Sequence, residues 1–122
     1  MSKTILMVDD SASVRQMVGM TLKQAGYSVV EACDGQEALQ KATANRVDAV
    51  ITDLNMPGMD GLTFIRHYRA SPASSGVPIV FLTTESDEGL KAQAKQAGAT
   101  GWMVKPFKPD QLLAIMRKVA GA

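Results

Sequence analysis

The sequence predicts an α/β fold in which a doubly wound parallel sheet is covered by helices on both faces. Short apolar runs rich in β-branched residues alternate with segments of helical spacing five times along the 122 residues. Such regular alternation is typical of parallel strands joined by right-handed helical crossovers. The length suits one domain with one core, whereas a closed eight-fold barrel needs about twice as many residues.

Five buried strands are expected, because each run is nearly continuous in apolar residues and is bounded by turn residues. The third run ends abruptly at Asp53, and Pro57 and Gly58 follow it. Asp53 should therefore stand at the C-terminal tip of a core strand, facing a loop. The predicted strands cover residues 4–8, 27–32, 47–52, 78–83 and 101–104.

Five helices are expected, one after each strand. The first carries apolar residues at helical spacing through 14–22, with Arg15 on its polar side, and it stops at Gly26. The second is rich in helix formers through residues 37–42. The remaining three are expected from Asp60-Gly61 to Ser71-Pro72, from the acidic first turn at 86–88 to Gly98, and onward from Pro109-Asp110.

The composition excludes several classes of protein. A formal net charge of +1 gives no bulk field that would attract nucleic acid or a membrane surface. No apolar run approaches the roughly 18 residues of a membrane span, and the first strand begins too early to leave room for a signal peptide. Cys33 is the single cysteine, and it is expected to pack behind the second strand. These features favour a cytoplasmic protein.

The C-terminal ends of the predicted strands carry polar residues that a parallel sheet would gather along one edge. In open α/β sheets this edge is where ligands bind. The set comprises Asp9 and Asp10 after the first strand, Asp53 and Asn55 at the third, Thr83 and Thr84 at the fourth, and Lys105 after the fifth.

Three converging carboxylates repel one another, by roughly 4 kcal/mol for two unit charges about 4 Å apart at an effective dielectric of about 20. A hard divalent cation with oxygen ligands, Mg²⁺ or Mn²⁺, would offset this repulsion. With Lys105 on the other side, the site suits a phosphoryl group, which Asp53 could accept as an acyl phosphate and Thr83 could hydrogen-bond. For any one Asp taken singly, a helix cap neutralised by Lys105 is the better interpretation, but the recurrence of such residues at successive strand ends favours a shared site.

These residues, in this order, resemble the receiver domain of two-component response regulators of the chemotaxis type. The matching motifs are Asp9-Asp10, Asp53 with the run 55–61, Thr83, and Lys105-Pro106-Phe107, and they span essentially the whole chain. The resemblance implies a flavodoxin-like fold with strand order 2-1-3-4-5. It also implies a cis peptide bond before Pro106 and one CheY-like receiver domain over residues 1–122 with no output domain.

The resemblance implies a role for each matching residue at the phosphoryl site. Asp53 would be the phosphoacceptor, and Lys105 would pair with the phosphoryl group. Asp10 would bind Mg²⁺ directly and Asp9 would bind it through water. The carboxylate of Asp53 and the backbone carbonyl of Asn55 would complete the protein's metal ligands.

The same resemblance implies residues for switching and for dephosphorylation. Thr83 would be the switch hydroxyl, and the backbone N–H of Thr84 would border the phosphoryl group. Trp102 stands where the family usually has a Tyr or Phe that rotates with the switch. Asn55 and Glu85 occupy the positions that tune self-dephosphorylation.

The implied function is a signalling module that catalyses only its own phosphorylation and dephosphorylation. The expected partners are a histidine kinase of the CheA type and a flagellar motor switch protein or a phosphatase, and the chain is expected to be a monomer. His67 lies on the third predicted helix, away from the strand tips, and is expected to face solvent.

Other functions remain open. The chain could drain phosphate from a shared kinase or serve a non-flagellar two-component pathway. An aspartyl phosphohydrolase would need an acid/base Asp at Asn55, and a flavin carrier would need hydroxyls and glycine in place of Asp9 and Asp10.

Overall fold

The computed structural model describes residues 3–54, 56–83 and 88–120, and it has the predicted α/β architecture. Strands and helices alternate along these described residues, with one short 3-10 turn, η1, between α3 and β4. The elements are β1 (Thr4–Val8), α1 (Ala12–Gln24), β2 (Ser28–Ala32), α2 (Gly35–Ala44), β3 (Ala49–Asp53), α3 (Gly61–Arg69), η1 (Pro72–Ser74), β4 (Ile79–Thr83), α4 (Glu88–Ala97), β5 (Gly101–Val104) and α5 (Pro109–Ala120).

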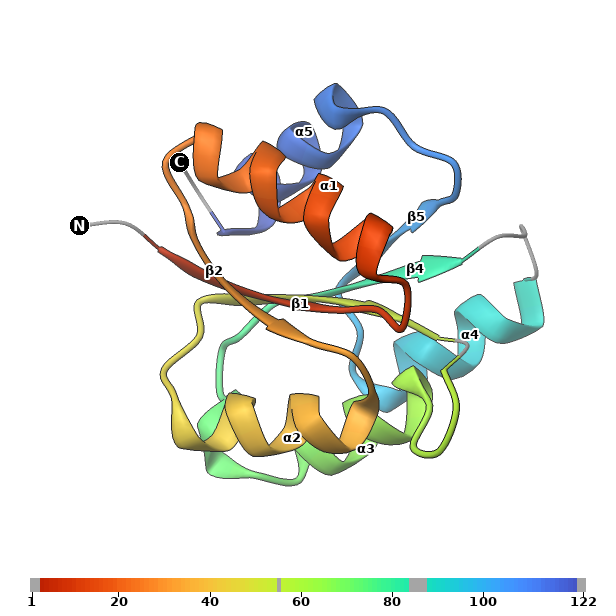
Figure 1. Cartoon of the computed structure of the whole chain (residues 1–122). Coiled ribbons are helices and arrows are strands. Elements are labelled where there is room, and N and C mark those ends of the chain that lie inside the picture. The colour runs from red at the N-terminus through yellow and green to blue at the C-terminus, as the bar shows by residue number, and fades with distance from the viewer. Residues whose placement is uncertain (1–2, 55, 84–87, 121–122) are drawn as a thin grey trace.

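The five strands form one parallel sheet in the order β2-β1-β3-β4-β5, which confirms the predicted order. Helices α1 and α5 cover one face, and α2, α3 and α4 cover the other (Figure 1). The register places Val8 beside Thr52 and Asp53 beside Leu82, so the strands end nearly level. The polar residues at the strand ends therefore meet at one edge, as expected for a parallel sheet.

The two faces of the sheet have separate apolar cores, because successive strand residues point to opposite sides. Leu6 and Val8 of β1 belong to the core under α2 and α3, where Phe64 and Tyr68 stack with ring centroids 5.7 Å apart. Ile5 and Met7 belong to the other core, under α1 and α5. The three central strands β1, β3 and β4 are buried on both faces, which explains why their sequences are almost continuously apolar instead of alternating.

Three helices begin with a side-chain cap that satisfies a free backbone N–H. Ser11 accepts from the N–H of Val14 at the start of α1. Asp34 and Asp60 do the same for α2 and α3, each across 2.8 Å. Separate residues thus cap these helices, so Asp9 and Asp53 are not needed as caps.

The structure tests the expectations for the peptide bond before Pro106 and for the position of Cys33. The Lys105–Pro106 peptide bond is cis, as the resemblance implies. The expectation for Cys33 is wrong: it is exposed, because β2 ends at Ala32 and the next residues bend away to begin α2. Its backbone N–H donates to the carboxylate of Glu37 across 2.7 Å.

Candidate functional site

Asp9 is fully buried at the point where β1 ends. Its backbone N–H donates to the carbonyl of Ala32 across 3.1 Å, which extends the pairing of β1 with β2 by one residue. Its carboxylate Oδ1 accepts from the N–H of Ser11 at 2.9 Å, at the start of α1. The turn into α1 therefore fixes the direction of the Asp9 side chain.

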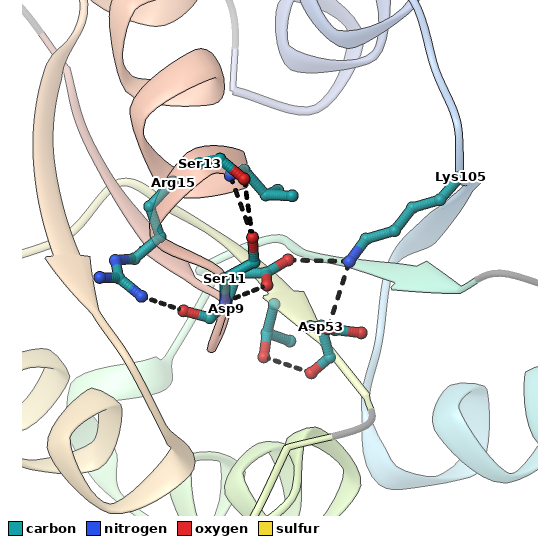
Figure 2. Close-up of polar contacts among 8 residues, drawn as sticks. Asp9, Ser11, Ser13, Arg15, Asp53 and Lys105 are labelled. Atoms are coloured by element: carbon teal, nitrogen blue, oxygen red, sulfur yellow. Dashed lines mark hydrogen bonds and ion pairs between the residues drawn. The ribbon is translucent and has the colours of Figure 1, made fainter.

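Lys105 joins the ends of β1 and β3 from the loop after β5 (Figure 2). Its Nζ lies 2.9 Å from Oδ2 of Asp9 and 3.2 Å from Oδ2 of Asp53. The backbone N–H of Lys105 donates to the carbonyl of Thr83 across 2.7 Å, which anchors the start of the loop to β4. One ammonium is thus shared by two carboxylates from different strands.

Asp9, Asp10 and Asp53 form a cluster in which one carboxylate oxygen from each lies within 4.8 Å of the others. Asp9 and Asp53 are buried, whereas Asp10 is exposed at the mouth of the cluster. Three negative charges face the single ammonium of Lys105, so the group keeps an excess of negative charge. Three carboxylates in a cluster that opens to solvent at Asp10 suit Mg²⁺, an ion that usually keeps several water ligands.

The environment of Lys105 favours its charged form. Burial by itself would lower the pKa of this amine, because a dry environment disfavours charge. The hydrogen bond to Asp9 and the negative charges of Asp53 and Asp9 outweigh burial, and the pKa of Lys105 is raised above its ordinary value. Lys105 therefore acts as a fixed positive charge at neutral pH.

Thr83 is buried at the end of β4, and its neighbour across the sheet is Val104 of β5. The register therefore brings it to the same edge as Asp53, which ends β3 one strand away. Asn55 and Thr84, predicted at this edge, and Glu85, expected to tune dephosphorylation, lie outside the described residues.

The sequence of the chain matches the model of the response regulator receiver domain over residues 5–117. The chain belongs to the response regulator receiver family. Its similarity to solved receiver structures extends over nearly its whole length. The chemotaxis protein CheY4 of Vibrio cholerae is 47% identical with a TM-score of 0.94, and the match covers 98% of this chain and 99% of CheY4.

Other receiver domains belong to different kinds of protein. The receiver domain of a sensor histidine kinase from Pseudomonas aeruginosa is 31% identical with a TM-score of 0.91 over the full length of both chains, and its crystal structure has a magnesium ion coordinated in the active site cleft. The phosphate regulon regulatory protein PhoB of P. aeruginosa is 34% identical over 96% of this chain, and the DNA-binding response regulator MtrA of Mycolicibacterium paratuberculosis is 39% identical over 96%. The chain spans about half the length of these curated relatives, 51% of each.

Trp102 of this receiver domain lies on β5 and is 48% exposed. Its indole stacks against Phe81 with ring centroids 6.5 Å apart, and Nζ of Lys91 lies 4.4 Å from its centre. Together with Lys95 of α4, these residues line a groove of about 290 Å³. The groove also includes Glu88, whose carboxylate lies 3.7 Å from Nζ of Lys91, so the structure places Trp102 beside a partly apolar groove with charges of both signs.

Arg15 contributes to the site, although the helical pattern had placed it on the polar side of α1. Its Nη1 donates to the backbone carbonyl of Asp9 across 2.6 Å (Figure 2). Helical spacing identified the face of α1 correctly, but it could not indicate that the side chain folds back across the first turn. His67 is exposed on α3, which confirms its predicted position.

No helix among residues 3–54, 56–83 and 88–120 has the length and apolar character that a bilayer crossing demands.

The raised pKa of Lys105 predicts how stability depends on pH in the absence of metal. A group whose pKa is higher in the folded chain stabilises it fully below the unfolded pKa, near 10.5 for lysine, and the stabilisation is lost as the pH rises through the folded value. In EDTA, we expect the free energy of unfolding to fall above pH 10.5 more steeply for the wild type than for Lys105→Met. Denaturant titrations from pH 9 to pH 12 would measure this, with the exposed Lys23→Met as control. Equal slopes for the wild type and Lys105→Met would contradict the pairing of Lys105 with the two carboxylates.

Proposed function

We propose that this chain is a phosphorylation-switched signalling protein of a two-component pathway, in which Asp53 accepts a phosphoryl group from a histidine kinase. The observation that carries the proposal is the position of Asp53 at the sheet edge. One oxygen of its carboxylate lies within reach of Asp9 and Asp10, and Nζ of Lys105 lies 3.2 Å from its Oδ2. Asp53, the candidate nucleophile, therefore lies beside carboxylates that can hold a cation and beside an ammonium group that can hold an anion.

In the proposed transfer, a carboxylate oxygen of Asp53 attacks the phosphorus of the kinase's phosphohistidine. The new O–P bond forms as the N–P bond breaks, and the released imidazole nitrogen takes up a proton from solvent. The negative charge on the equatorial phosphoryl oxygens faces the ammonium of Lys105. Attack of water on the same phosphorus later releases inorganic phosphate and restores the carboxylate. The protein thus catalyses only its own phosphorylation and dephosphorylation.

Asp9, Asp10 and Asp53 are the described residues that would hold Mg²⁺ in this proposal. Their hard oxygen donors, excess negative charge and opening to solvent at Asp10 fit that ion. When bound, Mg²⁺ neutralises charge on the reacting groups and helps to orient them. The likeness to the P. aeruginosa receiver domain that coordinates magnesium supports the same assignment.

We propose that phosphorylation is read on the face formed by α4, β5 and α5. A phosphoryl group adds about −1.5 to −2 charges at neutral pH, and Thr83 and Lys105 would close on its oxygens. Moving a two-state switch from 1:99 to 99:1 needs roughly 5.5 kcal/mol of differential interaction, which a few charge-assisted hydrogen bonds can supply. Trp102, on the strand next to Thr83, would change its environment with the switch.

Within this function we favour a chemotaxis role, with a kinase of the CheA type and a flagellar motor switch protein as partners. The 47% identity to CheY4 along nearly the full length of both chains supports this choice. We propose that residues 1–122 act as a single receiver domain without an output domain. The likeness to PhoB and MtrA favours the second candidate, a receiver that serves a different two-component pathway.

One experiment tests both the switch and the partner. Mg²⁺ and beryllofluoride, added together, should change the emission of Trp102, because it is the only tryptophan and lies on the proposed output face. The same activated protein should bind the N-terminal peptide of a flagellar motor switch protein more tightly, by roughly 10-fold or more if the coupling is typical. Fluorescence titration would follow both changes.

Asp53→Asn is the control, since it keeps the size of the side chain and removes the site that beryllofluoride modifies. An emission change with no gain in peptide affinity would overturn the motor-directed role and favour a phosphate sink or a non-flagellar partner. No emission change in the wild type would contradict the switching role of Trp102.

A further inference from the structure

Each of the four polar atoms of Asp9 has a protein partner. Its N–H pairs with Ala32, its Oδ1 with Ser11 and its Oδ2 with Lys105. The fourth partner is Arg15, which binds the backbone carbonyl. Ala32 and Ser11 contribute backbone atoms, and Lys105 is already part of the site. Arg15 is the one partner of Asp9 whose side chain has no role assigned so far.

Arg15 is itself held in place by Glu31 of β2. Its Nε lies 3.4 Å from Oε1 of Glu31, and the two side chains are 19% and 44% exposed. Glu31 is anchored in turn, because its backbone carbonyl accepts from Nζ of Lys41 on α2 at 2.6 Å. A chain of contacts therefore runs from β2 through Glu31 and Arg15 to the carbonyl of Asp9.

These contacts from Glu31 through Arg15 constrain where the Asp9 carboxylate can lie. The carbonyl bound by Arg15 immediately precedes Asp10, so the contact fixes the peptide plane between two of the three clustered carboxylates. Rotation of that plane would move both carboxylates relative to Asp53. An arginine held by a second residue is well suited to this task, because its planar fork can bind a carbonyl and a carboxylate at once.

We propose that Arg15, oriented by Glu31, is a positioning residue for the carboxylate cluster and thereby for the binding of Mg²⁺. The inference rests on the proposed function, since it concerns the same metal site. Arg15 acts through the backbone of Asp9 and Asp10 and does not touch the reacting groups. Glu31 acts through Arg15.

The sign of the effect on Mg²⁺ affinity separates this role from a simple charge effect. A positive charge near a cation site weakens cation binding, so the loss of Arg15 should strengthen Mg²⁺ binding if only its charge matters. If Arg15 positions the carboxylates, Arg15→Gln should weaken Mg²⁺ binding, by roughly 10-fold as for other residues that orient metal ligands. Arg15→Lys keeps the charge and one donor, and it should recover part of the loss.

Calorimetric titration of metal-free protein with MgCl₂ would measure the dissociation constants of the wild type and the variants. Lys23→Gln is the matched control, because it removes one positive charge from an exposed position of the same helix. Glu31→Gln should weaken Mg²⁺ binding in the wild type and have no further effect when combined with Arg15→Gln, since coupled residues are not additive. Circular dichroism in EDTA would confirm that each variant is folded. If Arg15→Gln is not folded, the Mg²⁺ affinity of Arg15→Lys tests the inference instead.

Unchanged or tighter Mg²⁺ binding by folded Arg15→Gln would overturn the inference, as would an additive effect of Glu31→Gln. If Arg15→Gln is not folded, Arg15→Lys with wild-type Mg²⁺ affinity would overturn it. These outcomes, with a wild type that binds Mg²⁺ and is labelled by acetyl phosphate, leave the proposed function intact. A wild type that neither binds Mg²⁺ nor is labelled would overturn the proposed function and the inference together.

Discussion

Asp53→Asn should abolish labelling of the chain by acetyl phosphate in the presence of Mg²⁺. The amide of asparagine is neutral and a poor nucleophile, so the acyl phosphate cannot form at this position. Loss of a nucleophile lowers the rate far more than loss of a supporting contact, and we expect labelling to fall by roughly 100-fold or more. Incorporation of ³²P and intact-protein mass spectrometry would measure the loss.

The matched control is Asp60→Asn, the same chemical change at the other end of the loop that follows β3. Asp60 caps α3 by accepting from the N–H of Thr63, and asparagine caps helices about as well. This variant should therefore stay folded and be labelled like the wild type. Full labelling of Asp53→Asn would mean that another residue is the phosphoacceptor and would overturn the assignment of the site.

Gly61→Ala should strongly destabilise the chain and disturb the same site. A Cβ at Gly61 would overlap the carbonyl oxygen of Asp53 and would lie 2.9 Å from Cα of Leu54. These are backbone atoms at the end of β3, so a side-chain rotation cannot relieve the overlap. We expect the free energy of unfolding to fall by about 3 kcal/mol or more, at or above the upper end for overpacking. Urea denaturation followed by circular dichroism would measure it.

Gly101→Ala is the control for this change. A Cβ at Gly101 would lie 3.7 Å from Cδ1 of Ile115, which is an ordinary van der Waals distance. We expect a change of less than about 1 kcal/mol in the free energy of unfolding, as for other glycine substitutions that fit their site. If Gly61→Ala were as stable as Gly101→Ala, the close packing of α3 against the end of β3 would not limit stability.

Much of the fold could be predicted because its signals are local. Continuous apolar runs marked the strands of a sheet buried on both faces, and glycine, proline and acidic residues marked where helices begin and end. The strand order came from the resemblance of the whole chain to a family, carried by residues such as Asp9-Asp10 and Lys105-Pro106. Cys33 was misplaced because one residue decides whether a strand continues or bends, and no periodic pattern resolves that.

The candidate site was predictable for a related reason. In a parallel sheet all the C-terminal strand ends lie at one edge, so residues far apart in the sequence can be placed together from strand assignments alone. That argument located Asp9, Asp53, Thr83 and Lys105. It could not give the distances, nor indicate that one ammonium bridges two of the carboxylates.

The sequence alone determined the class of fold, the family and the residues that converge, because these depend on apolar patterns and on the identity of residues at strand ends. The tertiary structure decided which atoms meet. Arg15 turns back to the carbonyl of Asp9, and Arg69 donates to the backbone carbonyls of Ser74, Val77 and Gly98. Backbone carbonyls are the same in every residue, so no sequence pattern identifies which of them an arginine will bind, and only the folded geometry selects the partner.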